Sequence, residues 1–440
     1  NFSHGSHQDH EEVINNIRVI NQETGNHVAI LADLQGPKIR VGKIENNGFM
    51  LESGNEIIFT SKECIGNEKK VYISYQNFPK DVHPGETILL DDGKLVLKIK
   101  STNKTDEVVA IVEHGGMLSS NKGVNLPNTK ISLPCLTEKD LEDLDFALKM
   151  KVSWIGLSFV RNARDIIELK HIIREKNSNA KVIAKIEKPE AISDIDDIIK
   201  HTDAIMVARG DLGVEIPFHE VPTIQKMIVK KCMKAAKPVI IATQMMESMI
   251  DNITPTRAEV NDVANAVMDG ADAVMLSGET SVGKHPVKVI ESITKIIEDV
   301  EKLDSVFHYE YPPEEDNHDR YITDSICFNS CRLAQRTNAS AIVTMTFSGY
   351  TGFKIASFRP RAGVYVFTGN EGILNMLSLV WGVRAFYYDK FVSTDHTIAD
   401  IKYILKKNHF VNEGDLIINI ASMPITEKGQ SNMMKLSYIE

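Results

Sequence analysis

Three charged side chains follow two neighbouring apolar runs in the middle of this 440-residue chain. In the segment AKIEKPE, Lys185 and Glu187 are two residues apart, so both lie on the same face of a strand. The next run ends in VARGDLG, which brings Asp211 to the same edge. Two carboxylates suit Mg²⁺ or Mn²⁺, and a lysine beside them could stabilise a phosphoryl group or an enolate. A simple ion pair is the alternative interpretation.

Other polar residues near these runs allow two interpretations each. Thr243, in IATQMMESM, could relay a proton or cap the segment that follows it. The turn RGDLG could receive a carboxylate or phosphate through its backbone N–H groups, or could be an ordinary turn. His4, His7 and His10 have a spacing that would suit zinc, but a solvated first helical turn is favoured because the sequence offers no further ligand beside them.

The segments that carry these groups alternate between apolar runs and amphipathic patterns, which predicts a parallel sheet covered by helices. Polar residues end several of the runs, and this favours a TIM (β/α)8 barrel over a doubly wound sheet, where they would gather at one switch point. The runs are HVAILADL, WIGLSFV, KVIAKIE, AIMVARGD, PVIIATQ and AVMLSGET, and the residues that end them are Asp33, Ser158, Lys185, Glu187, Asp211, Thr243 and Glu279.

The count of runs is two short of a closed barrel, because six are present and eight are needed. We therefore expect a barrel that lacks its first strands, with two further βα units before Asn1. On this interpretation Asn1 lies at the tip of the second strand. The first helix follows at once, and Ser6 with Asp9 three residues later is typical of a capped helix start.

Two further units are expected beside the barrel. Residues 39–126 show β-branched alternation and turn signals, which predict an inserted β-barrel lid domain. After Leu303 the pattern changes to a C-terminal α/β domain for regulation or oligomerisation, residues 304–440, reached through the acidic segment YPPEEDNHD. The barrel then comprises residues 1–38 and 127–303.

Composition excludes several classes of function. A net charge of −10 argues against a large nucleic-acid interface, and no apolar run reaches the length of a membrane helix, about 20 residues. Five scattered cysteines are typical of reduced thiols in a cytoplasmic protein. Cys327 and Cys331 are interpreted as core residues, since no second pair completes a zinc site.

The chain resembles the pyruvate kinase family over essentially its whole length. The motifs are NFSHG, LADLQGPKIR, DDG, KGVNLP, LSFVRNA, AKIEKPEAI, IMVARGDLGVEI, IIATQMMESM, PTRAEVNDVANAVMDGADAVMLSGET and SNMMK. The resemblance implies a TIM barrel, a lid and a C-terminal α/β domain, usually in a cytoplasmic homotetramer. It also implies glycolytic transfer of the phosphoryl group of phosphoenolpyruvate to ADP, with Mg²⁺ or Mn²⁺, giving pyruvate and ATP.

The resemblance also assigns roles to individual residues. Glu187 and Asp211 are implied metal ligands, and Lys185 is implied to stabilise the phosphoryl group and the enolate. Thr243 is implied to take part in substrate binding and proton delivery. Arg40 is implied to take part in catalysis. The implied substrate-binding residues are Gly210, Asp211, Thr243, Lys185 and Ser158. The implied nucleotide contacts are Asn1, His4, Arg40 and Lys122. The arginine that usually stands two residues before Asn1 is absent from this sequence.

One departure from the family concerns K⁺, which most members hold through an Asn, a Ser, an Asp and a Thr. Asn1, Ser3 and Asp33 match, but Leu34 stands at the Thr position. Lys38 stands where K⁺-dependent members have a glutamate. An ammonium near Asp33 could replace the monovalent cation, so we expect K⁺ not to be required. The alternative is that Lys38 simply faces solvent.

Alternatives remain for regulation and for the reaction. TMTFSGYTG resembles the loop that binds sugar-phosphate effectors, although a locally satisfied helix N-terminus would look the same, and the loop MPITEKGQSN is short. A metal-dependent aldolase acting on phosphoenolpyruvate or pyruvate would share the paired acids. A non-catalytic binding protein is disfavoured because Lys185, Glu187, Asp211 and Thr243 are all present.

Overall fold

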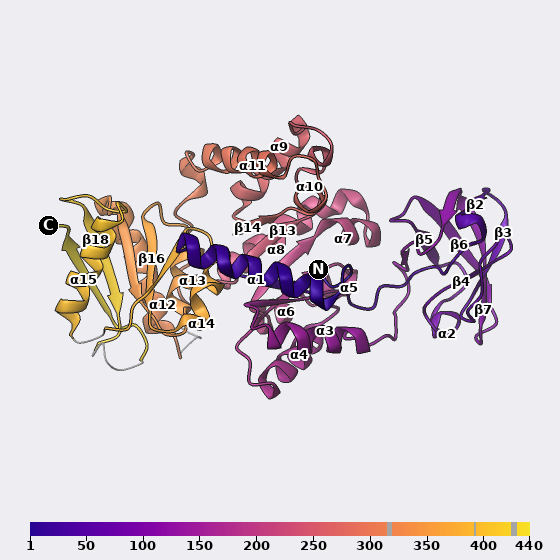
Figure 1. The fold of residues 1–440 in the computed structure, drawn as a ribbon, viewed down its shortest axis with the longest axis horizontal. Coiled ribbons are helices and arrows are strands. Elements are labelled where there is room, and N and C mark those ends of the chain that lie inside the picture. The colour runs from indigo at the N-terminus through magenta and orange to yellow at the C-terminus, as the bar shows by residue number, and fades with distance from the viewer. Residues whose placement is uncertain (315–318, 391–392, 424–428) are drawn as a thin grey trace.

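The computed structural model describes residues 1–314, 319–390, 393–423 and 429–440. Three units follow one another along its long axis (Figure 1). The lid lies at one end, the barrel unit in the middle and the C-terminal domain at the other end. The lid interrupts the barrel unit between its first strand and the helix that precedes its second.

The middle unit is built on six parallel strands whose order in space follows the sequence. They are β1 (Leu31–Asp33), β10 (Trp154–Leu157), β11 (Lys181–Ile186), β12 (Ala204–Ala208), β13 (Val239–Ala242) and β14 (Ala273–Met275). Asp33 lies opposite Gly156 and Ala242 opposite Met275, so the carboxyl ends share one edge of the sheet. The six strands predicted from the sequence are confirmed, and the two units expected before Asn1 remain a prediction.

Helices cover one face of this sheet because their apolar stripes pack on it in a single buried cluster. The first helix has the predicted capping box, in which Ser6 accepts from the Asp9 amide and Asp9 accepts from the Ser6 amide. The helices are α1 (His7–Thr24), α3 (Glu138–Lys149), α4 (Ala163–Glu175), α5 (Pro189–Ser193), α6 (Ile195–His201), α7 (Arg209–Glu215), α8 (Val221–Lys234), α9 (Arg257–Asp269), α10 (Gly278–Ser281) and α11 (Pro286–Val300).

The opposite face of the sheet carries the site. Alternate residues of a strand point to opposite faces, and Val182 and Ala184 belong to the helix-packed cluster. Ile183 belongs instead to a second cluster, which also holds Trp154 and Met206. Lys185 follows Ile183 by two residues, so it continues this second face toward the carboxyl edge.

The lid is formed by β-strands with their own buried core. Its larger sheet has the order β4-β3-β7-β6-β5-β9, and β2 pairs with β8 in a separate ribbon. The elements are β2 (Gly48–Leu51), β3 (Glu56–Thr60), β4 (Lys70–Tyr72), α2 (Phe78–Asp81), β5 (Thr87–Leu90), β6 (Leu95–Thr102), β7 (Glu107–His114), β8 (Gly116–Ser119) and β9 (Val124–Asn125).

The C-terminal domain is an open sheet of order β17-β16-β15-β18-β19, in which only β19 runs antiparallel to its neighbour. The α/β domain expected from the sequence is confirmed, whereas the antiparallel strand β19 was not expected. The elements are α12 (Tyr321–Thr337), β15 (Ala341–Met345), α13 (Tyr350–Ser357), β16 (Gly363–Thr368), α14 (Glu371–Leu374), β17 (Val383–Tyr387), α15 (Thr394–Lys407), β18 (Leu416–Ala421) and β19 (Met433–Tyr438).

Several smaller sequence expectations can be compared with these elements. Cys327 and Cys331 are buried in the core of the C-terminal domain, as predicted, and burial raises the pKa of the Cys327 thiol to about 12. Parts of the predicted linker YPPEEDNHD and of the loop MPITEKGQSN, residues 315–318 and 424–428, lie outside the described residues. Within the described ranges, no helix is both long and apolar enough to cross a bilayer.

A buried ion pair joins the barrel unit to the C-terminal domain. The guanidinium of Arg359 lies 3.2 Å from Asp272, and both side chains are almost fully buried. Asp272 also accepts hydrogen bonds from the amides of Val239 and Trp381, at 3.0 and 3.1 Å. One carboxylate therefore connects strand β13, the start of β14 and the C-terminal domain.

We expect Asp272→Ala to lower the midpoint of thermal unfolding by several degrees. It leaves the buried Arg359 without its carboxylate, and removing one partner of a buried pair costs about 3–5 kcal/mol. The matched control is Asp304→Ala, which removes the fully exposed partner of Arg361 and should cost about 1 kcal/mol at most. Equal shifts for the two variants would contradict the assigned role of Asp272.

Candidate active site

Lys185 lies between two carboxylates at the carboxyl edge of the sheet. Its Nζ is 3.0 Å from Asp33 Oδ1 and 3.0 Å from Glu187 Oε1. It also donates to Ser158 Oγ at 2.8 Å, and Ser158 in turn donates to the Leu34 carbonyl at 2.7 Å. The groups come from the ends of three neighbouring strands, β1, β10 and β11, as the sequence predicted.

The ionisation of this cluster follows from burial and charge. Burial alone would lower the pKa of Lys185, but the carboxylates of Glu187 and Asp33 outweigh it, so the pKa is raised. Burial raises the pKa of Glu187, Lys185 opposes that shift, and the negative charge of Asp211 adds to it. Lys185 is therefore a permanent cation, and Glu187 and Asp211 are close enough to repel each other.

Backbone geometry fixes Glu187. The amide of Phe159 donates to Glu187 Oε2 at 2.6 Å, and Phe159 itself has a left-handed backbone, φ 54°. A Cβ at Gly36, itself at φ 69°, would lie 2.8 Å from the Phe159 ring, so only glycine allows the loop after β1 to pass there. The glycine of the DLQGPKIR motif thus has a packing role.

Thr243 is held next to the first turn of α7, which begins directly after β12. Its Oγ1 accepts from the Gly210 amide at 2.8 Å, and its own backbone is left-handed at φ 69°. Arg209 donates to the Thr243 carbonyl at 2.6 Å and pairs with Asp262 at 2.7 Å. The Gly210 amide, which the resemblance assigns to a substrate carboxylate, is therefore engaged by Thr243 in this structure.

The amino-terminal residues reach the same cluster. Asn1 donates to Asp33 Oδ2 at 3.2 Å, and its own side-chain oxygen accepts from the Ser3 amide at 2.8 Å. His4 is exposed. His7 is exposed, in agreement with the expected solvated first turn, and it also pairs with Asp143 at 2.7 Å and stacks on Phe146.

Three basic residues lie at the junction of barrel and lid. Lys38 Nζ is 3.7 Å from Asp211 Oδ1, with its side chain about one-third exposed. Arg40 donates to the Asn121 carbonyl at 3.1 Å, and Lys122 pairs with Asp91 at 2.7 Å. Arg40 and Lys122 thus contact lid residues, whereas Lys38 contacts the barrel acid Asp211.

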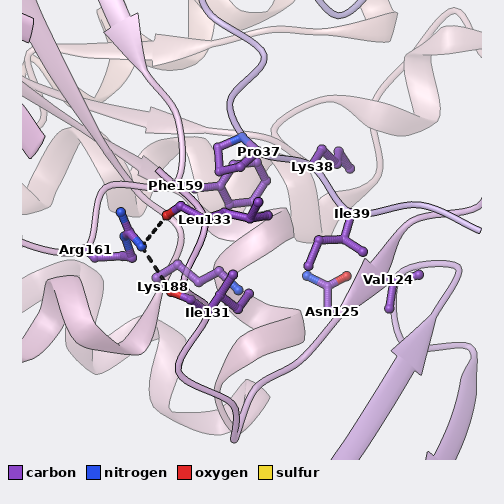
Figure 2. A pocket seen from close by; sticks show the side chains of 10 residues that line it. All are labelled: Pro37, Lys38, Ile39, Val124, Asn125, Ile131, Leu133, Phe159, Arg161 and Lys188. Carbon is purple, nitrogen blue, oxygen red and sulfur yellow. Dashed lines mark hydrogen bonds between the residues drawn. The ribbon is translucent and has the colours of Figure 1, made fainter. Parts of the chain in front are cut away.

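A pocket lies between the lid and the barrel, beside these basic residues (Figure 2). Arg161 donates to the carbonyls of Ile131 and Leu133 on its wall, at 3.2 and 2.8 Å. Its lining residues are Pro37, Lys38, Ile39, Val124, Asn125, Ile131, Leu133, Phe159, Arg161 and Lys188. The cleft beside the acids is therefore bounded by both domains.

The arrangement fits a divalent cation. Glu187 and Asp211 present two carboxylates whose mutual repulsion a cation would relieve, and Mg²⁺ in proteins takes one or two carboxylates plus water and substrate oxygens. Among the described residues there is no set of three His, Cys, Asp or Glu side chains placed to bind a metal. Water or substrate oxygens would supply the remaining ligands of such an ion.

Sequence reasoning missed the groups that position this site. It did not identify the Phe159 amide, because backbone donors have no residue signature. It also missed Arg209, although an arginine directly after an apolar strand was a visible signal. Lys188 and Glu215, a buried pair 2.7 Å apart, were overlooked because their partners lie on different elements.

Comparisons with known proteins agree along the whole chain. Residues 1–290 match the family described as pyruvate kinase, barrel domain, and residues 324–437 match pyruvate kinase, alpha/beta domain. The pyruvate kinase of Corynebacterium glutamicum is 43% identical over 434 residues, which are 99% of this chain and 90% of that protein. The pyruvate kinase of Geobacillus stearothermophilus is 40% identical over all of this chain and 75% of its own length.

A solved structure shows the same architecture. The crystal structure of a pyruvate kinase from Cryptosporidium parvum has a TM-score of 0.92 and 33% identity, covering 100% of this chain and 90% of that one. The fold class predicted from the sequence, a barrel with an added sheet domain and a C-terminal α/β domain, is confirmed. The domain boundaries remain predictions.

We expect Glu187→Gln to weaken Mn²⁺ binding by about tenfold or more, because a carboxylate ligand is replaced by a neutral amide. Titration followed by electron paramagnetic resonance measures the free ion directly and needs no turnover. Glu190→Gln, three residues along the same segment, is the matched control and should bind as the unchanged protein does. Equal Mn²⁺ affinity in all three proteins would exclude Glu187 as a ligand.

Proposed function

Because this chain belongs to the pyruvate kinase family, we propose that its own residues carry the transfer of a phosphoryl group from phosphoenolpyruvate to ADP in the way described below. The family identity makes the chain an enzyme of this phosphotransfer. The observation that carries the detailed assignment is the placement of Lys185 between Asp33 and Glu187, with Asp211 close to Glu187.

Lys185 provides fixed positive charge at the reacting phosphoryl group. Phosphoryl transfer needs little covalent help from the protein and depends on positioning and charge neutralisation. The side chain of Lys185 is only 12% exposed, so its charge acts at short range in a site with little water. After transfer, the same ammonium stabilises the enolate oxygen that phosphoenolpyruvate leaves behind.

Glu187 and Asp211 are the side chains that would hold Mg²⁺ or Mn²⁺. When bound, such an ion neutralises charge on phosphoryl and enolate oxygens. Ser158 keeps Lys185 oriented through its 2.8 Å hydrogen bond, and the Phe159 amide keeps Glu187 turned toward the site.

Thr243 is assigned to substrate binding and proton delivery. Its Oγ1 accepts from the Gly210 amide, so the hydroxyl hydrogen remains available for a substrate or for a water that protonates the enolate. The Asp211 backbone, with that of Gly210, is assigned to the substrate carboxylate. Binding a carboxylate at Gly210 then requires its amide to leave Thr243.

The nucleotide phosphates are assigned to Asn1, His4, Arg40 and Lys122. Asn1 and His4 lie in the loop beside β1, and Arg40 and Lys122 lie on the lid side of the cleft. Closure of the lid would bring its cations toward the phosphates and exclude water, which competes for the phosphoryl group. Arg40 is proposed to contribute to catalysis in the same way.

K⁺ is proposed not to be required. Leu34 has a buried side chain with no oxygen to offer, and the Lys38 ammonium is placed at the same rim, 3.7 Å from Asp211. That contact indicates that the Lys38 ammonium pairs with Asp211 and not with Asp33, the acid expected from the sequence. It also weighs against the alternative that Lys38 simply faces solvent.

Three broader assignments rest on the family alone. A cytoplasmic location, a homotetramer and a sugar-phosphate effector at the TMTFSGYTG loop are proposed from resemblance. In the structure this loop leads into α13, and Gly349 at φ 83° precedes the helix. The domain and chain matches give no support to the metal-dependent aldolase considered above.

We expect the protein to form pyruvate from phosphoenolpyruvate only when ADP and Mg²⁺ are both present, followed through a coupled lactate dehydrogenase. Lys185→Met should lower kcat by about 10²–10³, the effect of removing one preorganised electrostatic contact. Lys181→Met, on the same strand but at its other end, is the matched control. Retained activity in Lys185→Met would contradict the role assigned to this ammonium.

The K⁺ proposal predicts full turnover with Mg²⁺ in a tetramethylammonium buffer, with less than a twofold gain on adding K⁺. In Leu34→Thr/Lys38→Glu, which supplies two oxygen ligands and removes the ammonium, K⁺ should raise turnover by about tenfold or more. A tenfold K⁺ activation of the unchanged protein would refute the proposal.

A further inference from the structure

A buried ion pair lies at the junction of lid and barrel, outside the residues assigned above. Lys188 Nζ is 2.7 Å from Glu215 Oε1, and the Glu215 side chain is only 1% exposed. The side-chain amide of Asn125 donates through Nδ2 to the same carboxylate oxygen at 2.8 Å. Asn125 belongs to the lid strand β9, whereas Glu215 ends the barrel helix α7.

Each member of this cluster lies close in sequence to a residue of the proposed site. Glu215 is four residues after Asp211 on α7, so the two side chains share one face of the helix. Asn125 is three residues after Lys122, and Lys188 directly follows Glu187. One carboxylate therefore connects the segments that carry both metal ligands and the lid lysine.

The hydrogen bond, rather than packing, is suited to fix the lid at this point. Asn125 and Lys188 both line the pocket between the two domains, which leaves space beside the contact (Figure 2). Strand β9 is only two residues long and pairs with β5 of the lid. A segment that pairs with its own sheet over only two residues can shift unless a hydrogen bond to the barrel restrains it.

We propose that Glu215 is a positioning residue, which ties the lid through Asn125 to the metal-ligand helix and so sets the distance between Lys122 and Asp211. A purely structural Lys188–Glu215 pair would not need a donor from another domain. The inference rests on the proposed function only for the roles of Lys122 and Asp211. The contact itself does not depend on that assignment.

The test breaks the tether from the lid side with Asn125→Leu, which leaves the buried Lys188–Glu215 pair intact. The matched control is Asn128→Leu, because Asn128 is an exposed asparagine three residues along the same segment whose side-chain oxygen accepts from the Thr87 amide, and which makes no hydrogen bond to Glu215 within the described part of the chain. Spin labels at Met50→Cys and Ile167→Cys, both exposed positions, report the lid-to-barrel distance in a Cys64→Ser background. The other four cysteines are buried.

We expect Asn125→Leu to broaden the distance distribution and to weaken ADP binding, measured calorimetrically, by roughly tenfold, the effect of losing one hydrogen bond to a charged group. The kcat at saturating substrates should change less than threefold. Asn128→Leu should match the unchanged protein in all three measurements.

Two results would overturn the proposal. One is a distance distribution for Asn125→Leu that equals that of Asn128→Leu. The other is a broadened distribution for Asn125→Leu with unchanged ADP affinity. In that case the Asn125–Glu215 bond would restrain the lid but would not position it for the nucleotide. Neither the distance measurement nor the calorimetry needs turnover. If the protein formed no pyruvate, the proposed function would be contradicted, but these two measurements would still decide whether Glu215 positions the lid.

Discussion

The position of the Lys185 ammonium between Asp33 and Glu187 is the contact on which the site depends. A cation that is nearly buried is stable there only because two carboxylates lie 3.0 Å away. The lysine in turn favours the ionised form of Glu187, because burial alone would favour its protonated form. The cluster therefore holds a positive charge at the site before any substrate arrives, which is what charge neutralisation during phosphoryl transfer requires.

Strand geometry explains why these charges meet. Lys185 and Glu187 continue the strand face that carries Ile183, and this face lies opposite the one that the helices cover. Parallel order places Asp33, Ser158 and Lys185 at one edge. Glycine at position 36 and left-handed residues at 159 and 243 then turn the chain sharply after three strands, and at the second of these turns the Phe159 amide donates to Glu187.

The sequence predicted the residues at the ends of the strands well, because burial periodicity and polar residues at strand ends are local signals. It predicted less of what lies between elements. Strand β19 was missed because the alternation in Met433–Tyr438 is weak and its pairing with β18 is nonlocal. The contact of Lys38 with Asp211, rather than with Asp33, depends on how the lid joins the barrel, which no short motif encodes.

The central claim is that Lys185, Glu187 and Asp211 serve one bound ion and one substrate at a single edge of the sheet. A crystal structure of the protein soaked with Mn²⁺ and oxalate, a planar dianion shaped like the enolate of pyruvate, tests it directly through the anomalous signal of the metal. We expect a single strong peak coordinated by Glu187 and Asp211, with Lys185 donating to an oxalate oxygen. A peak bound away from these carboxylates, or Lys185 still paired only with Asp33 and Glu187 beside an occupied site, would contradict it.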